Sequence, residues 1–288
     1  MTELIPQLIA EGPVVTDGAW GSLFLSLGLD PGDLGDAWNL SHPDRVEAVP
    51  RAYVEAGSRV ILTNTFRSNR ITLARYGLAE KLEEINRTGV EISRRAAAGR
   101  ARVFASLGST GKLLLTGETT PEELSAVFSE QVRILASAGA DAIVIETMGD
   151  LAETVLALQA ARATGLPVVV CMVFDTGKNK DRTLMGATPE QVAAELTAAG
   201  ADVIGANCGQ GIAGYIPICR RLRAATDRPL WIKPNAGLPE VVDGRTMYRT
   251  TPEEFAAHIP ALLDAGANFI GGCCGTTPDF VRAIVGKL

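Results

Sequence analysis

Three of the five cysteines stand in polar, glycine-containing segments of the sequence. Cys273 and Cys274 are adjacent in FIGGCCGTTPDF (269–280), and Cys208 lies in GANCGQG (205–211). Adjacent cysteines rarely bond to each other, because the small ring would strain both the peptide and the disulfide. Three thiolates form a zinc ligand set that leaves a fourth position open. These segments therefore predict a catalytic zinc site.

An open position beside three thiolates favours a thiol as the incoming ligand, because a metal stabilises the thiolate at neutral pH. A thiolate is a good nucleophile for an alkyl group. A zinc hydrolase is the alternative, although it usually needs histidine or carboxylate ligands and a general base. The two histidines, His42 and His258, lie in helix-like or loop segments. A barrel that binds a thiol without catalysis is a third possibility.

The other two cysteines have a simpler interpretation. Cys171 lies within the apolar run PVVVCMVF, and Cys219 lies in the helix-like segment YIPICRRLRAA. We expect both to be core residues. The N-terminus shows no signal-peptide pattern, and no apolar run approaches the roughly 20 residues of a membrane span, so we expect a cytoplasmic protein without a membrane partner.

Eight short apolar runs alternate with helix-like segments along the chain. Continuous apolar runs are typical of parallel strands buried on both faces. Eight such units in 288 residues predict an α/β fold, a single (β/α)8 TIM barrel over residues 1–288. An open doubly wound sheet is less favoured, because no G-x-G-x-x-G follows the first strand. The expected strands are 13–18, 59–64, 102–108, 142–147, 167–174, 203–209, 229–235 and 269–275.

Four helix-like segments open with the same signal, a threonine followed by proline and an acidic residue. They are 120–139, 188–200, 250–266 and 276–286. Threonine is a good N-cap, proline suits the first helical position, and an acidic residue suits the positive end of the helix dipole. A barrel enzyme builds its site at the carboxyl ends of its strands. The predicted strands end at the polar residues Asp17, Thr65, Glu146, Asn207 and Asn235, and at the three cysteines.

The net charge of −6 and the pI of about 5.1 argue against a nucleic-acid partner, which would need a basic surface. No low-complexity linker divides the chain. Forty-seven per cent of the residues are hydrophobic, which is enough for one large core.

Several motifs occur in order along nearly the whole chain: TDGAWGS (16–22), TNTF (63–66), ETMGD (146–150), GANCGQG (205–211), NAGLP (235–239) and GGCCGTTP (271–278). Together they resemble the homocysteine S-methyltransferase family, and most closely the homocysteine-binding domain of cobalamin-dependent methionine synthases. The double cysteine with its upstream partner is the most specific match. The resemblance implies a TIM barrel that methylates homocysteine to methionine.

The resemblance also implies roles for individual residues. Zinc would be held by Cys208, Cys273 and Cys274, which are thereby the catalytic residues. The substrate ammonium would meet Asp17 and Glu146, and the substrate carboxylate would meet the backbone amides of Gly18 and Ala19. Weaker candidates that orient these groups are Thr65, Asn207 and Asn235.

Gly275 stands where S-methylmethionine-dependent members of the family tend to carry arginine, which favours the methionine synthase type. The sequence ends soon after the cysteine pair, so we expect the methyl group to come from outside. Our first choice of donor is methylcobalamin on a separate corrinoid protein. The alternatives are S-methylmethionine, S-adenosylmethionine and betaine.

Overall fold

Strands and helices alternate along the chain in the computed structural model, which describes residues 3–242 and 245–288. Eight parallel strands form one sheet in the order β1-β10-β7-β6-β5-β4-β3-β2. Each strand overlaps one of the predicted apolar runs. The strands are β1 (Val14–Val15), β2 (Val60–Leu62), β3 (Arg102–Leu107), β4 (Ala142–Met148), β5 (Val168–Met172), β6 (Val203–Gly211), β7 (Leu230–Asn235) and β10 (Ala267–Ile270).

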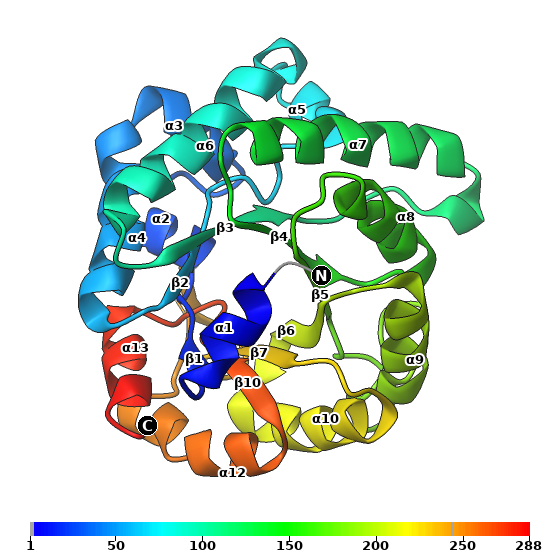
Figure 1. Ribbon diagram of the computed structural model, residues 1–288. Helices are drawn as coiled ribbons and strands as arrows, with labels where there is room; N and C mark the ends of the chain where they lie inside the picture. The colour runs from blue at the N-terminus through cyan, green and yellow to red at the C-terminus, as the bar shows by residue number, and fades with distance from the viewer. Residues whose placement is uncertain (1–2, 243–244) are drawn as a thin grey trace.

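The sheet closes on itself into a barrel. Thr16, just after β1, pairs in parallel with Val60 of β2, and the Arg59 amide donates to the Val15 carbonyl at 2.8 Å. Figure 1 shows the strands around a common axis with the helices outside them. The predicted TIM barrel is therefore confirmed, and the open doubly wound sheet is not the fold.

Eight helices form most of the outer layer: α4 (Pro43–Ala56), α6 (Leu82–Ala97), α7 (Pro121–Ser137), α8 (Leu151–Arg162), α9 (Pro189–Ala199), α10 (Ile212–Ala225), α12 (Ile259–Asp264) and α13 (Pro278–Val285). Shorter helices are α2 (Gly21–Ser26), α3 (Trp38–Ser41), α5 (Arg70–Arg75) and α11 (Pro252–Ala256). Single 3-10 turns are η1 (Gly35–Ala37), η2 (Ala79–Lys81) and η3 (Leu114–Thr116). A two-stranded antiparallel sheet, β8 (Glu240–Val242) and β9 (Arg245–Met247), follows β7.

The predicted threonine caps hold at three helix starts. Thr120, Thr188 and Thr251 each form a full capping box with the residue three positions on. Thr277 precedes α13 without a side-chain cap. The single helix predicted over 250–266 was wrong, because α11 and α12 are separate helices. Pro260 lies at the start of α12, where its missing amide is tolerated, whereas one continuous helix would place it in the interior.

The core has two layers, one inside the barrel and one between strands and helices. Inside, Trp231 stacks between Phe104 and Phe269, with ring centroids 6.0 and 5.2 Å apart. Helix α1 (Leu4–Ala10) lies across one end of the barrel in Figure 1 and adds Ile5 and Leu8 to this inner layer.

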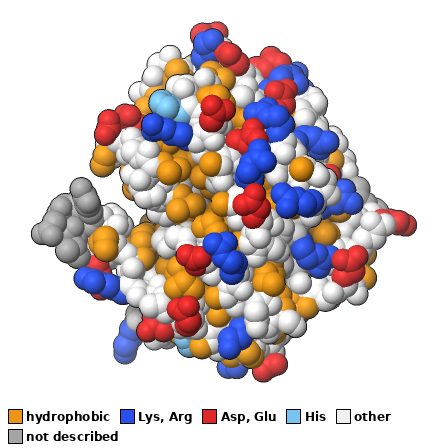
Figure 2. Space-filling view, turned by 90° about the vertical axis from the view of Figure 1, so that its left-hand side faces the viewer, with side chains coloured by type: hydrophobic (Ala, Val, Ile, Leu, Met, Phe, Trp, Pro, Cys, Tyr) orange, Lys and Arg blue, Asp and Glu red, His pale blue; other side chains and the backbone are white. Residues whose placement is uncertain are grey.

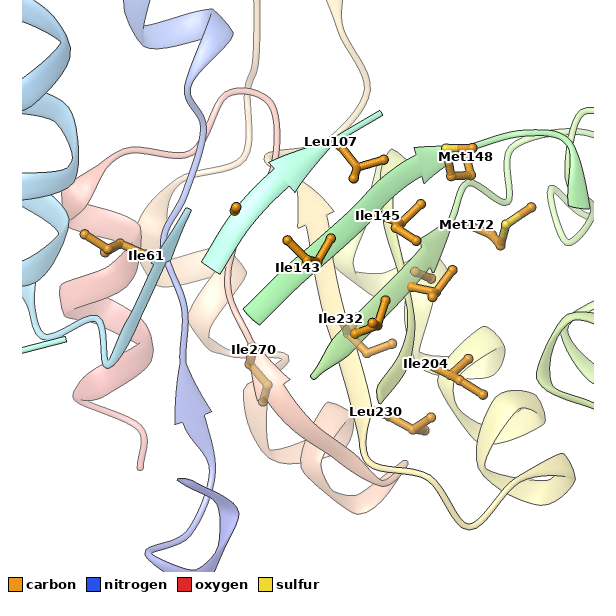
Figure 3. Close-up of a cluster of buried hydrophobic side chains, with 14 of the residues drawn as sticks. Ile61, Leu107, Ile143, Ile145, Met148, Met172, Ile204, Leu230, Ile232 and Ile270 are labelled. Carbon is orange, nitrogen blue, oxygen red and sulfur yellow. The ribbon is translucent and has the colours of Figure 1, made fainter. Parts of the chain in front are cut away.

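The outer layer consists of strand side chains that point away from the barrel axis towards the helices. Figure 3 shows Ile61, Ile143 and Ile232 among them. Cys171 lies in the inner layer and Cys219 in the outer one, both fully buried, which confirms their prediction as core residues.

The face of the molecule in Figure 2 carries acidic and basic side chains side by side, with hydrophobic side chains gathered towards the middle. Among the described residues, no helix combines the length and the apolar character needed to span a membrane.

Trp231→Ala should destabilise the fold by about 3–5 kcal/mol, because it empties the centre of the inner layer. Urea unfolding followed by circular dichroism measures the loss. Leu115→Ala is the control, since Leu115 is 81 % exposed and should change stability by less than about 0.5 kcal/mol. Equal effects of the two substitutions would contradict the assigned packing.

Candidate active site

Three sulfurs from two distant segments meet at the carboxyl end of the barrel. Cys208 lies near the end of β6, and Cys273 and Cys274 lie in the turn after β10. The Cys208 Sγ and Cys274 Sγ atoms are 4.0 Å apart, and all three sulfurs lie within 4.8 Å of one another. The side chains are partly buried. One ion could therefore contact all three sulfurs.

The neighbouring strand β7 holds the double-cysteine turn in place. The Cys273 amide donates to the Pro234 carbonyl at 2.7 Å, and the Cys274 amide donates to Asn235 Oδ1 at 3.1 Å. The Thr276 hydroxyl donates to the Cys273 carbonyl at 2.7 Å. The turn is thus fixed at its backbone, which leaves both sulfurs free to face Cys208.

Two glycines in this turn are required for different reasons. A Cβ atom at Gly271 would lie 2.0 Å from Thr16 Oγ1, so Gly271 permits the close approach of β10 to β1. Gly275 has a φ of +82°, and a Cβ atom there would lie 2.2 Å from the ring of Tyr248. Of the three glycines beside the cysteine pair, Gly271, Gly272 and Gly275, only Gly275 adopts a left-handed conformation.

The three thiols differ in pKa. Hydrogen bonds from Cys273 and Cys274 lower the pKa of Cys208 to about 3. The same contact with Cys208 raises the pKa of Cys273 and raises that of Cys274 to about 12. Without a cation, therefore, only one of the three thiols ionises readily.

Glu146, at the end of β4, is held from two sides. The Ser106 hydroxyl donates to Oε1 at 2.5 Å, and Asn207 Nδ2 lies 3.3 Å from Oε2. Burial is the main cause of its raised pKa. Asn207 also exchanges two hydrogen bonds with Thr147, a β-branched residue held at a φ of +58°. Because Asn207 Nδ2 lies 3.8 Å from Cys273 Sγ, this network links the carboxylate to the sulfurs.

Asp17, two residues after β1, is completely buried and already has three donors. Lys233 Nζ lies 2.5 Å from Oδ1, while the Trp20 indole and the Leu62 amide each donate to Oδ2 at 2.8 Å. Lys233 lines the neighbouring cavity, and Asp17 lies behind it. The contact of Asp17 with a substrate ammonium stays a prediction, and in the structure the ammonium beside it belongs to Lys233.

The remaining predicted residues take different places. Gly18 lines the cavity, as does Ala19, but the Ala19 amide donates to Thr276 Oγ1 at 3.1 Å. Thr65 is buried and donates to the Ser106 carbonyl at 2.6 Å, so its hydroxyl is used by the neighbouring strand β3 and Thr65 does not line the cavity. Asn235 acts on Cys274 through the hydrogen bond given above.

A cavity of about 360 Å³ opens above these groups. Its base carries the three cysteines, Glu146 and Lys233, and its wall includes the aromatic side chains of Trp20, Phe24 and Phe66. An apolar wall around a few polar groups is typical of a small-molecule site.

Sequence reasoning missed three side chains of this region. Lys233 was not predicted as a site residue, although a lysine within the apolar run PLWIKPN (229–235) is a visible signal. Ser106 gave no signal of its own. Tyr248 follows β9 and packs on Gly275; its pKa is raised by burial and by Cys274.

Fold and site together define a class: TIM-barrel proteins with a cluster of three cysteines at the carboxyl end of the strands. The homocysteine S-methyltransferase family model matches residues 14–288. The chain therefore belongs to the homocysteine S-methyltransferase family, a family of methyltransferase enzymes.

Curated relatives include methionine synthases from two mycobacteria. The chain is 30% identical to that of Mycobacterium leprae (strain TN) over 302 residues, and 30% identical to that of Mycobacterium tuberculosis (strain ATCC 25618 / H37Rv) over 305 residues. Each alignment covers 98% of this chain, which spans only 25% of the relative. Among solved structures, the metallated form of the homocysteine methyltransferase MmuM from Escherichia coli matches with a TM-score of 0.84 at 23% identity, over 100% of both chains. This last match supports the fold.

Gly275→Ala should destabilise the protein by clearly more than Gly12→Ala. Both glycines have a positive φ, which costs an alanine about 1 kcal/mol, but no atom lies within 4 Å of a Cβ at Gly12. The alanine at 275 must in addition displace Tyr248. Thermal unfolding of both variants measures the difference, and equal shifts would refute the close contact.

Proposed function

We propose that this protein transfers a methyl group to the thiolate of homocysteine and forms methionine, with zinc held by Cys208, Cys273 and Cys274. The observation that carries the proposal is the meeting of these three sulfurs at the base of a cavity, in a chain of this family.

The donor set fits zinc on its own chemistry. Three thiols this close cannot all ionise unless a cation offsets their repulsion, and thiolates are ligands that zinc prefers. Zinc, when bound, would supply an open coordination position at which an incoming thiol loses its proton near neutral pH.

The protein's own residues would position the reactants. Asn235 and Thr276 fix the cysteine turn, and Glu146 offers a carboxylate to the substrate ammonium. The aromatic wall keeps water away from the sulfur, which preserves its nucleophilicity. In the reaction, a sulfur–carbon bond forms to the methyl group while the donor's bond to that group breaks, and the bonding pair stays with the donor.

For the donor we propose a methylated corrinoid protein. The family resemblance of the sequence and the kinship with methionine synthases support this choice. Gly275 also supports this choice. S-Methylmethionine-dependent members of the family tend to carry arginine at that position, and here Tyr248 fills the space that such a side chain would occupy. S-Methylmethionine, S-adenosylmethionine and betaine are the competing donors.

Cys273→Ser should reduce bound zinc from about one ion per chain to less than about a tenth. Metal analysis after gel filtration measures the content. Cys219→Ser is the matched control, because Cys219 is buried in the outer core, away from the cluster, and should leave the zinc content unchanged. Full zinc retention by Cys273→Ser would refute the proposed ligand set.

The zinc-loaded protein should form methionine from homocysteine when a methylcobalt donor is supplied. Mass spectrometry of the product, with each of the four donors in turn, measures this. Turnover only with S-methylmethionine, S-adenosylmethionine or betaine would refute the proposed corrinoid donor and identify the donor that the protein uses. Hydrolysis without any thiol would instead favour the zinc hydrolase, and thiol binding without turnover would refute the methyltransferase.

A further inference from the structure

Lys233 is a buried lysine at the base of the cavity. It lies on β7 two residues after Trp231 and two before Asn235, so all three side chains point to the inside of the barrel. Lys233 is only 2 % exposed, yet it lines the cavity. A buried ammonium is costly unless it is paired, so its partners must explain its presence.

Its first partner is Asp17. Lys233 Nζ donates to Asp17 Oδ1 at 2.5 Å, and the Trp20 indole and the Leu62 amide occupy the other carboxylate oxygen. The ammonium of Lys233 thus lies between this carboxylate and the cavity.

Glu146 is a second carboxyl group that lines the cavity with Lys233, but its hydrogen bonds go to Ser106 and Asn207. Burial lowers the pKa of Lys233, but the carboxylates of Asp17 and then Glu146 outweigh burial, and the net shift is upward. For Glu146, burial raises the pKa and Lys233 is the largest opposing influence. Lys233 therefore pairs directly with Asp17, and its influence on Glu146 is electrostatic only.

We propose that Lys233 is a specificity-determining residue whose ammonium does for Asp17 what the α-ammonium of a substrate would otherwise do. The site therefore accepts small thiol acids that lack an α-amino group, as well as homocysteine. This inference rests on the proposed methyl transfer and names its substrate class.

The chemistry at sulfur is the same for such a substrate. In 4-mercaptobutyrate, which is homocysteine without its amino group, the thiol proton passes to solvent and the sulfur bonds to the methyl carbon. The donor's bond to that carbon breaks and the donor keeps the electron pair. The methyl donor is the one that the proposed function requires.

The test compares the affinities of homocysteine and 4-mercaptobutyrate for the zinc-loaded protein by calorimetry. We expect the two dissociation constants of the wild type to lie within about tenfold of each other. In Lys233→Met, the uncompensated Asp17 carboxylate should shift the ratio by at least about tenfold in favour of homocysteine, because it now repels the amino-free acid and attracts an ammonium. The double variant D17N/K233M removes both charges and should return the ratio towards that of the wild type.

Two results would overturn the inference. One is a wild-type preference for homocysteine above about 100-fold, which needs no variant and so decides the case even if Lys233→Met does not fold. The other is an unchanged ratio in folded Lys233→Met. Product analysis with both thiols separates the two proposals: methylation of homocysteine alone sinks this inference, whereas methylation of neither thiol sinks the proposed function.

Discussion

Mutual repulsion among three thiolates is the constraint on which this site depends. At sulfur separations within 4.8 Å, hydrogen bonding lets Cys208 ionise only while Cys273 and Cys274 keep their protons. Full ionisation of the cluster needs a cation, which the proposed zinc would supply, and the backbone must bring the three sulfurs together. The bonds from β7 to the cysteine turn, through Pro234 and Asn235, meet this need. The barrel thus fixes the positions of β6, β7 and the turn after β10 relative to one another, and with them the three sulfurs.

The barrel fold and the cluster of three cysteines could be predicted from the sequence, because the signals for both are local. Each strand is a continuous apolar run, and Thr120, Thr188 and Thr251 mark helix starts with a motif that needs no tertiary partner. The cysteines stood out because they fall at strand ends, and parallel strands in a barrel bring those ends to one edge.

Partnerships across the barrel could not be predicted, because they join residues far apart in sequence. Nothing in the sequence near Asp17 indicates that Lys233, 216 positions away, is its partner. Nor does the sequence indicate that Thr276 Oγ1 accepts a hydrogen bond from the Ala19 amide. The left-handed φ of Thr147 likewise depends on Asn207 from another strand. A local pattern also misled where Pro260 divides a segment with otherwise helical composition.

Lys233 matters because it offsets negative charge at the cavity base. The proposed divalent ion would leave three thiolates with a net negative charge, and the Asp17 carboxylate adds to it in a region of low dielectric. An amino-acid thiol brings its own ammonium to such a base, but it also brings a thiolate and a carboxylate, so it does not reduce the excess. A fixed ammonium on β7 reduces it before any substrate enters, and it costs no substrate binding energy. The proposed role of Lys233 would make substrate choice at this site depend on a residue of the barrel wall as well as on the sulfurs.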